Sequence, residues 1–277
     1  MLKQRVITAL VLMALLVPSL MVGSPWPFAL FCLLLMAGAA WEWARLNGGD
    51  AVSIALAAAL VGACAVAFGL GWVTQAPAPL WWAALGVWVL GVGWALRAGV
   101  AAWGVHPKWV RWLVGLVLLW LAWLAILNAR RVGINFMLSV FCVVWMADIA
   151  AYFGGKAFGR RKLAPTISPG KSWEGVWSGM LGVVALAFVW LIVDRTFGVD
   201  SQSVFSQLLG RLGWFGAALV VVFLCALSVV GDLFESLVKR SAGAKDSSRL
   251  LPGHGGVLDR FDALLPVVPA ALAFASL

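Results

Sequence analysis

The chain has 277 residues, of which 64% are hydrophobic and 11% charged, and its mean hydropathy is +1.01. Because soluble domains contain roughly 25% charged residues, this composition excludes an ordinary soluble protein and predicts an integral membrane protein. The formal net charge is +9, yet no basic domain stands clear of the apolar runs. We therefore expect no nucleic-acid partner.

Nine apolar runs are candidates for membrane-spanning helices, since a helix needs about 20 residues to cross roughly 30 Å of hydrocarbon. The first eight are 5–23, 26–44, 52–71, 80–97, 110–128, 133–153, 174–193 and 214–231. The ninth, 263–277, is shorter and contains Pro266 and Pro269, which suits a broken or incomplete span. The predicted fold is an all-α, polytopic transmembrane bundle of eight or nine spans.

The distribution of basic residues predicts the orientation. If the N-terminus is cytoplasmic, 16 of the 20 Lys and Arg lie on the inward side, and the outward side holds only Arg130, Arg131, Arg195 and Arg211. The positive-inside rule favours this topology. We expect an inner-membrane protein of a bacterium whose basic, cytoplasmic face attracts anionic lipid headgroups or soluble anions.

The first polar segment covers residues 147–175. It begins at Asp148 inside a predicted span and continues through glycines, prolines and cations to Ser168, Lys171 and Ser172. We expect the glycines and prolines to prevent a continuous helix, and exposed backbone N–H groups beside Lys and Arg suit phosphate oxygens. Ser172 followed by Glu174 also has the form of a helix start, so an ordinary basic loop with a capped helix is the alternative.

The second polar segment covers residues 232–262. Its first polar residues recur at the spacing of one helix face, which predicts that the preceding span continues out of the bilayer; they are Asp232, Glu235, Ser236, Lys239 and Arg240. A carboxylate at the membrane edge needs a partner, another helix or a water-filled cavity. Interfacial salt bridges without chemistry would explain this part of the segment equally well.

The rest of that segment favours chemistry. Asp246, Asp259 and Asp262 bring the acidic residues between 232 and 262 to five of the chain's eleven, and hard oxygen ligands beside cations are what Mg²⁺-assisted phosphoryl chemistry requires. The glycines around His254 let the backbone approach a ligand, and the imidazole can donate to a phosphate. A glycine turn with a solvated histidine is the alternative.

At these residues the chain resembles the phosphatidate cytidylyltransferases, also called CDP-diacylglycerol synthases. The resemblance rests on Ser236-x-x-Lys239-Arg240-x4-Lys245-Asp246, followed by Pro252-x-His254-Gly255-Gly256-x-x-Asp259-Arg260-x-Asp262. The upstream segment from Asp148 to Gly175 is similar to a second common segment of that family, with Lys171-Ser172 where the family usually has Lys-Thr. The two segments cover the C-terminal half, and the expected division is into N-terminal helices 1–130 and a catalytic region 131–277 with cytoplasmic loops 154–173 and 232–262.

The resemblance implies transfer of a cytidylyl group from CTP to phosphatidate, with Mg²⁺ as cofactor and room for a second cation. It implies that Asp232 and Asp259 ligate the metal. The other catalytic candidates are Asp246, Asp262, Lys239 and Arg240, and the candidate substrate-binding residues are Asp148, Ser168, Lys171, Ser172, Ser236, Lys245, His254 and Arg260.

Two other functions fit part of the pattern. A CTP-dependent lipid-alcohol kinase would also use Mg²⁺ and basic loops at a membrane, but it would transfer the γ-phosphate. A transporter would place charges at mid-span and show inverted repeats, whereas here the charges collect at one face. The expected partners are the two substrates and membrane lipid, and homodimer formation is left open.

Overall fold

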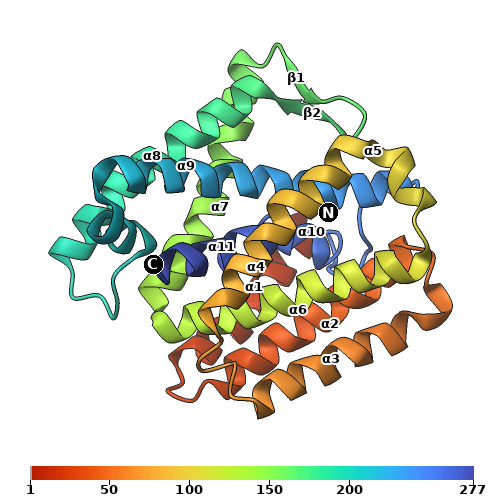
Figure 1. Ribbon diagram of the computed structural model, residues 1–277, viewed down its shortest axis with the longest axis horizontal. Coiled ribbons are helices and arrows are strands. Elements are labelled where there is room, and N and C mark those ends of the chain that lie inside the picture. Colours follow the sequence, from red (N-terminus) through yellow and green to blue (C-terminus); the bar gives the residue numbers. More distant parts are fainter. Residues whose placement is uncertain (1) are drawn as a thin grey trace.

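The structure is a computed structural model that describes residues 2–277. Helix accounts for 78% of the chain, and in the described residues eight helical stretches are long and apolar enough to cross a membrane. The predicted all-α bundle is therefore confirmed. The first elements, drawn in Figure 1, are α1 (Leu2–Met21), α2 (Trp26–Leu46), the 3-10 turn η1 (Asp50–Val52), α3 (Ser53–Gly69), α4 (Ala78–Gly86), the π-helical η2 (Val87–Val92) and α5 (Gly93–Val105).

The second part of the chain forms α6 (Lys108–Val132), α7 (Ile134–Phe158), β1 (Lys162–Ala164), β2 (Ser168–Ser172), α8 (Trp173–Thr196), α9 (Val204–Ser241), α10 (Leu258–Phe261) and α11 (Leu264–Ala275). The predicted span 80–97 is part of a longer helical stretch formed by α4, η2 and α5. The predicted span 214–231 lies within α9, whose backbone leaves helical geometry only at Gly213, with φ 66°.

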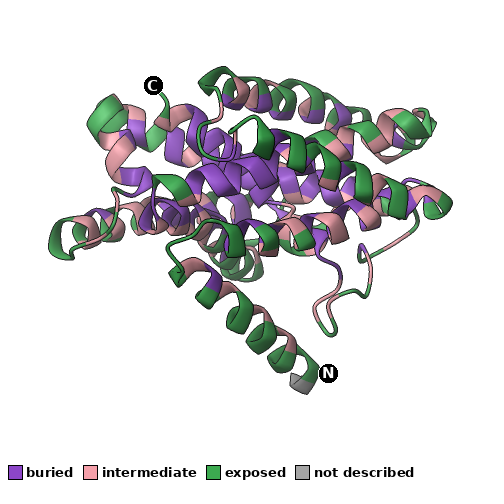
Figure 2. Ribbon diagram, turned by 90° about the horizontal axis from the view of Figure 1, so that it is seen from below, coloured by how far each residue is buried: buried purple, intermediate pink, exposed green. Residues whose placement is uncertain are grey.

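Burial is concentrated in the middle of the bundle, as the purple segments of Figure 2 show. Helix α11 packs against α4, α6 and α9, and all residues from Leu264 to Ala273 are buried. Twelve helical residues extend about 18 Å, so α11 is too short to be the ninth complete span. Helix α1 is the opposite case: it diverges from the bundle in Figure 2, and its apolar side chains are exposed, as expected of a lipid-facing helix.

Helices α7 and α8 form a closely packed hairpin because small residues face one another. A Cβ atom on Gly154 would lie 1.9 Å from Ser178 Oγ, and one on Gly179 would lie 3.0 Å from the carbonyl oxygen of Ala147. Small residues allow such close backbone approach between membrane helices. The expectation that glycines interrupt the helix was wrong at Gly154 and Gly155, because both lie inside α7 and serve this packing.

The loop predicted at 154–173 is therefore shorter and more ordered than expected. After α7 ends, β1 and β2 form an antiparallel hairpin in which Lys162 pairs with Ser172, and Figure 1 shows this hairpin beyond the ends of α7 and α8. Helix α8 then begins with Ser172 as its N-cap, whose Oγ accepts from the Gly175 N–H at 3.2 Å. This confirms the predicted helix start, and the continuation of α9 to Ser241 confirms the helical reading of 232–240.

Gly154→Leu tests the α7–α8 packing. The added side chain overlaps Ser178 Cβ, which lies 2.2 Å from the position of a Cβ on Gly154, so we expect a loss of about 1–3 kcal/mol in the free energy of unfolding. Thermal unfolding of the purified protein in detergent measures it. The matched control is Gly62→Leu in α3, where a Cβ meets nothing within 4 Å; equal unfolding midpoints for the two variants would contradict the packing argument.

Candidate active site

A cavity of about 530 Å³ lies where α7, β2, α8 and α9 meet. Its polar lining includes Asp148 from α7, Ser168, Lys171 and Ser172 from β2, and Asp232 from α9. The remaining wall is mostly small or apolar, with Tyr152 as its one aromatic side chain among the lining residues. The two polar segments recognised in the sequence thus contribute to one cavity.

An ion pair joins these segments directly. Lys171 Nζ lies 2.5 Å from Asp232 Oδ2, and the two side chains are 25% and 29% exposed. The other carboxylate oxygen of Asp232 accepts from Ser236 Oγ at 3.2 Å. Residues about 60 positions apart in the chain are held in contact by this pair, because the β hairpin carries Lys171 onto the side of α9.

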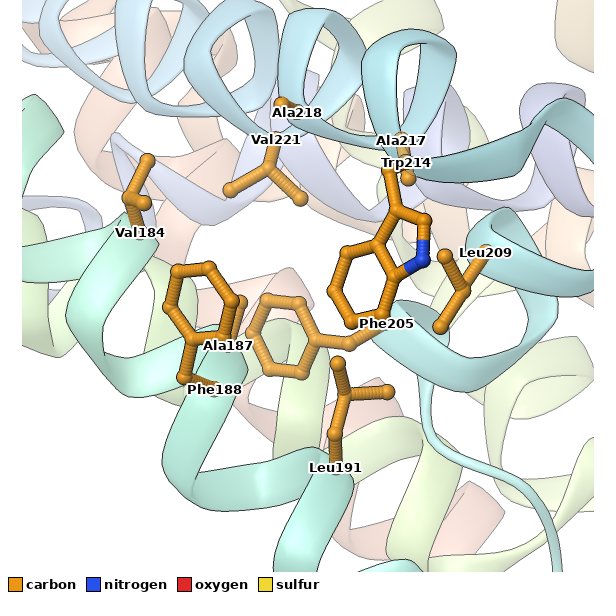
Figure 3. A pocket seen from close by; sticks show the side chains of 10 residues that line it. All are labelled: Val184, Ala187, Phe188, Leu191, Phe205, Leu209, Trp214, Ala217, Ala218 and Val221. Carbon is orange, nitrogen blue, oxygen red and sulfur yellow. The ribbon is translucent and has the colours of Figure 1, made fainter.

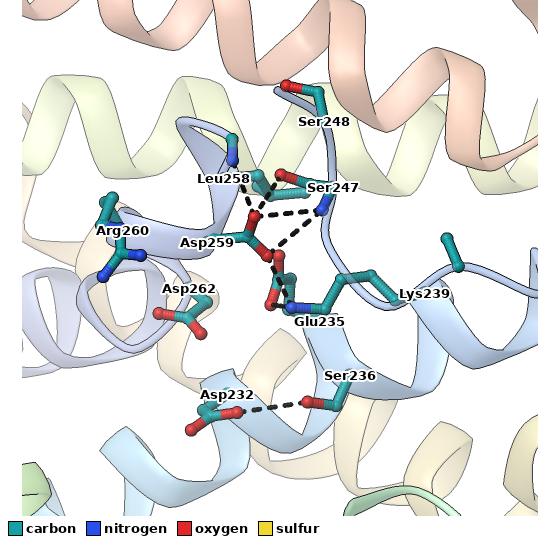
Figure 4. A network of polar contacts seen from close by, with 12 residues as sticks. Asp232, Glu235, Ser236, Lys239, Ser247, Ser248, Leu258, Asp259, Arg260 and Asp262 are labelled. Carbon is teal, nitrogen blue, oxygen red and sulfur yellow. Dashed lines mark hydrogen bonds and ion pairs between the residues drawn. The ribbon is translucent and has the colours of Figure 1, made fainter. Parts of the chain in front are cut away.

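A second charged cluster lies further along α9. Lys239 Nζ is 2.5 Å from Glu235 Oε2 and 2.6 Å from Asp259 Oδ1, so one ammonium group bridges two carboxylates, as Figure 4 shows. Asp259 also accepts from the N–H and Oγ of Ser247, both at 3.0 Å, and from the Gly256 N–H at 2.8 Å. Burial raises the pKa of Asp259, but the hydrogen bonds from its neighbours outweigh burial and lower the pKa to about 2. The Asp259 carboxylate is thus ionised and fixed.

Asp262 occupies a different position from Asp259, although only three residues separate them. Burial and the neighbouring carboxylates of Asp232 and Asp148 raise the pKa of Asp262 to about 7. None of the ion pairs between described residues includes Asp262 or Asp148. Three carboxylates therefore lie near one another while Lys171 pairs with only one of them.

This donor set suits a hard divalent cation. Within residues 2–277, no three Asp, Glu, His or Cys side chains are arranged as a complete metal site. Mg²⁺ usually binds through one or two carboxylates together with substrate phosphates and water, so an incomplete carboxylate site beside a cavity fits this ion. Asp232 lines the cavity, Asp262 lies near Asp232 in Figure 4, and Asp259 is paired with the ammonium group of Lys239.

Sequence reasoning missed a buried carboxylate in α2. Glu42 is 0% exposed and accepts four hydrogen bonds: from Ser247 Oγ at 3.1 Å, Ser248 Oγ at 2.5 Å, the Val257 N–H at 2.9 Å and the Leu258 N–H at 2.7 Å. It holds both ends of the 247–258 loop. The sequence could have indicated Glu42, because a carboxylate inside an apolar run requires polar partners.

Two arginines of the second segment, Arg240 and Arg260, are held by backbone carbonyl groups. Arg240 donates to the carbonyl oxygens of Ile167, at 3.4 Å, and Ala244, at 3.1 Å, so it links the two polar segments. Arg260 donates through two nitrogens to the carbonyl oxygen of His254. The imidazole Nδ1 of His254 is buried and has no hydrogen-bond partner in the structure.

Two predicted site residues lie elsewhere. Lys245 and Asp246 are exposed and line a separate cavity of about 770 Å³, together with Arg45, Arg249 and the loop serines. The structure therefore does not bring them to the cavity of Asp148, Lys171 and Asp232. Ser247 connects the 770 Å³ cavity to the Lys239–Asp259 ion pair, because it lines that cavity and its hydroxyl group donates to Asp259.

A third cavity, about 50 Å³, lies between α8 and α9 and is entirely apolar in its side chains except for the indole N–H of Trp214. Figure 3 shows Phe188, Phe205 and Trp214 gathered around it. With no ionisable side chain in its lining, it has no groups for phosphoryl chemistry. It is a packing gap between two membrane helices.

The fold is that of a polytopic membrane protein, and its charged cavity at one end of the helices suits an anionic ligand. The chain belongs to the cytidylyltransferase family, whose model matches residues 3–277. It is 42% identical over 285 residues to a phosphatidate cytidylyltransferase of Pseudomonas aeruginosa, covering 100% of this chain and 98% of that relative. It is also 48% identical over 137 residues to the enzyme of that name from Haemophilus influenzae, a match that covers 50% of this chain and 44% of that relative. To the enzyme of that name from Bacillus subtilis it is 37% identical over 142 residues, which covers 51% of this chain and 48% of that relative.

Glu42→Gln tests the anchoring of the 247–258 loop. Each oxygen of Glu42 accepts one backbone N–H, from Val257 or Leu258, so the amide NH₂ must face a backbone donor in either orientation. An unsatisfied buried donor costs roughly 1–3 kcal/mol, and we expect amide hydrogen exchange at 257–258 to accelerate by about tenfold or more. Asp50→Asn is the control, because this carboxylate is 71% exposed and its one ion pair within residues 2–277 is with Arg45. Unchanged exchange in Glu42→Gln would show that the carboxylate does not hold the loop.

Proposed function

We propose that this protein transfers a cytidylyl group from CTP to phosphatidate, forming CDP-diacylglycerol and releasing pyrophosphate. The full-length similarity to a phosphatidate cytidylyltransferase carries the proposal, and the cavity of Asp148, Lys171 and Asp232 is the proposed reaction site. A lipid-alcohol kinase or a transporter finds no comparable support.

In the proposed reaction, an oxygen of the phosphatidate phosphate forms a bond to the α-phosphorus of CTP, and the bond from that phosphorus to the bridging oxygen of the β-phosphate breaks. The lipid phosphate is already anionic near neutral pH, so no covalent protein nucleophile is required. The enzyme must instead align and neutralise several negative charges. Lys171 and Lys156 line the cavity and supply positive charge there, and Ser168 and Ser172 supply hydroxyl groups beside it.

The ion pair with Asp232 explains why Lys171 is suited to bind a substrate phosphate. In the structure its ammonium group is paired with Asp232, so it is held at the cavity wall before any substrate arrives. A phosphate entering the cavity meets a positioned cation rather than a mobile one, which lowers the entropic cost of alignment. Arg240 would act indirectly, by fixing the β hairpin through the carbonyl group of Ile167.

We place Mg²⁺ beside Asp232, with its second protein ligand from the 259–262 segment. Asp262 is free of ion pairs among the described residues, whereas Asp259 would exchange the ammonium group of Lys239 for the metal, as Asp232 would exchange that of Lys171. When bound, the ion supplies neutralisation of the triphosphate oxygens and of the departing pyrophosphate. Lys239, Lys245 and Arg260 remain the further candidates for contacts with phosphate.

We place the cavity at the cytoplasmic side of a bacterial inner membrane. CTP then enters from water, and the acyl chains of phosphatidate stay in hydrocarbon while the headgroup reaches Lys171. The apolar wall formed by Val176 and Val229 would face the glycerol and the first methylenes of the lipid.

The position of phosphorus label in the products separates the proposed transferase from the kinase. With CTP labelled at the γ-phosphorus, we expect all label in pyrophosphate and none in lipid; with CTP labelled at the α-phosphorus, we expect label in the lipid product. The purified protein, Mg²⁺, phosphatidate and, in a parallel reaction, diacylglycerol as a lipid alcohol suffice, and thin-layer chromatography of the lipid fraction reads the result. Transfer of γ-label to lipid would establish a kinase instead.

Lys171→Met tests the proposed cavity. Removing a cation that faces developing charge in a reaction site costs about 100-fold or more in turnover, and we expect that loss in the pyrophosphate-release rate. Lys162→Met is the matched control, because Lys162 is an exposed cation on the same β hairpin and does not line the cavity. Turnover of Lys171→Met equal to that of the control would place the reaction elsewhere.

A further inference from the structure

A polar cavity of about 420 Å³ lies at the opposite end of the bundle from the candidate active site. Helix α9 connects the two, since Arg211 near its start lines this cavity and Asp232 near its end lines the other. From Trp214, just after the break at Gly213, to Asp232 the regular helix rises about 27 Å, close to the thickness of the hydrocarbon core. The two cavities therefore lie near opposite ends of the membrane-spanning part of α9.

The donors of this cavity come from three elements. Asn128 and Arg131 lie near the end of α6, Gln207 and Arg211 lie in the first turns of α9, and Gln75 lies in the connection between α3 and α4. A neighbouring cavity of about 240 Å³ also contains Arg131 and adds Arg130. Three of the four cations predicted for the outward face thus border one continuous region.

No carboxylate lines either cavity. The acidic residues of this face, Asp194 and Asp200, are used elsewhere: Asp194 accepts from Asn135, Ser203 and Ser206, and Asp200 accepts from the N–H groups of Ile134 and Asn135. None of the ion pairs between described residues includes Arg130, Arg131 or Arg211. The described lining of the region thus carries three arginines and no Asp or Glu side chain.

Part of this region is rigid. Asn128 donates to the carbonyl oxygens of Trp72 and Leu124 and accepts from the Ala76 N–H. It therefore fixes the connection between α3 and α4, which lines the 420 Å³ cavity. Arg130 is anchored by Nη2 on the carbonyl oxygen of Leu20 at 2.9 Å, while its Nε is buried without a partner. A buried guanidinium N–H without an acceptor is costly, so Arg130 has one donor at the edge of this region for which the described residues supply no acceptor.

The apolar part of the lining distinguishes a lipid from a free anion. Trp81 and Leu272 are buried side chains of this wall, and Val132 is 42% exposed at its rim. Guanidinium groups bind phosphate oxygens in bidentate fashion, and the apolar wall beside them suits the glycerol and acyl chains attached to a phosphate. Since cations are otherwise scarce on this face, a resident anionic ligand accounts for their grouping.

We propose that the arginine cavity around Arg131 and Arg211 binds the phosphate headgroup of an anionic phospholipid from the membrane leaflet opposite the candidate active site. This site is separate from the proposed reaction site and does not depend on the proposed function.

The test compares the double variant Arg131→Gln/Arg211→Gln with Arg195→Gln. Arg195 is an exposed cation at the end of α8 on the same face and lines neither cavity. Each full-length protein is purified in neutral detergent and titrated with phosphatidylglycerol, phosphatidylcholine or inorganic phosphate. The midpoint of thermal unfolding and the number of retained lipids in native mass spectrometry are measured.

We expect phosphatidylglycerol to raise the unfolding midpoint of the wild type and of Arg195→Gln, with its apparent affinity about tenfold or more lower in the double variant. Turnover of CTP in detergent should be the same in all three proteins. Equal phosphatidylglycerol binding by the double variant and the control would overturn the site. An equal effect of inorganic phosphate at the same concentration would overturn the lipid assignment. If the double variant does not fold, Arg211→Gln alone, at an exposed position, must show the loss of lipid retention.

Discussion

Two lysines fix the position of α9 relative to the rest of the charged site. Lys171 reaches Asp232 from the β hairpin, and Lys239 joins Glu235 on the same helix to Asp259 in the following segment. Such partly buried pairs add little net stability, because desolvation offsets their attraction, but removal of one partner leaves an uncompensated charge. Their effect is therefore on specificity: they favour the arrangement of hairpin, helix and loop in which both ammonium groups meet their carboxylates.

The packing of α7 against α8 makes the first of these pairs geometrically accessible. Gly154 and Gly179 allow the two helices to approach closely, so that the hairpin between them is short and its second strand ends at the N-cap Ser172. The strand direction then delivers Lys171 to α9. A wider helix pair would require a longer connection, and the position of the ammonium group would be less well determined.

The sequence pattern predicted the charged site better than the local backbone. The spacing of Asp232, Ser236 and Lys239 correctly indicated that the helix continues beyond the apolar run, and hydrogen-bonding chemistry correctly indicated the cap at Ser172. Gly154 and Gly155 were misinterpreted because tertiary packing between membrane helices favours the same residues as a flexible loop. The separation of Lys245 and Asp246 from Asp232 could not be predicted, because it depends on how the 242–258 segment folds back over α2.

The N-terminal half supplies part of the site's precision, although its sequence shows little besides apolar helices. Glu42 in α2 accepts hydrogen bonds from both ends of the 247–258 loop. Arg5 and Thr8 in α1 donate to the carbonyl oxygens of Gly253 and Pro252 in the same loop, both at 2.9 Å. Adding a Cβ to Gly256 would bring it within 2.5 Å of Glu42 Oε1, so the glycine is needed for this contact. The glycine-rich turn around His254 is therefore shaped by two helices more than 200 residues away in the chain.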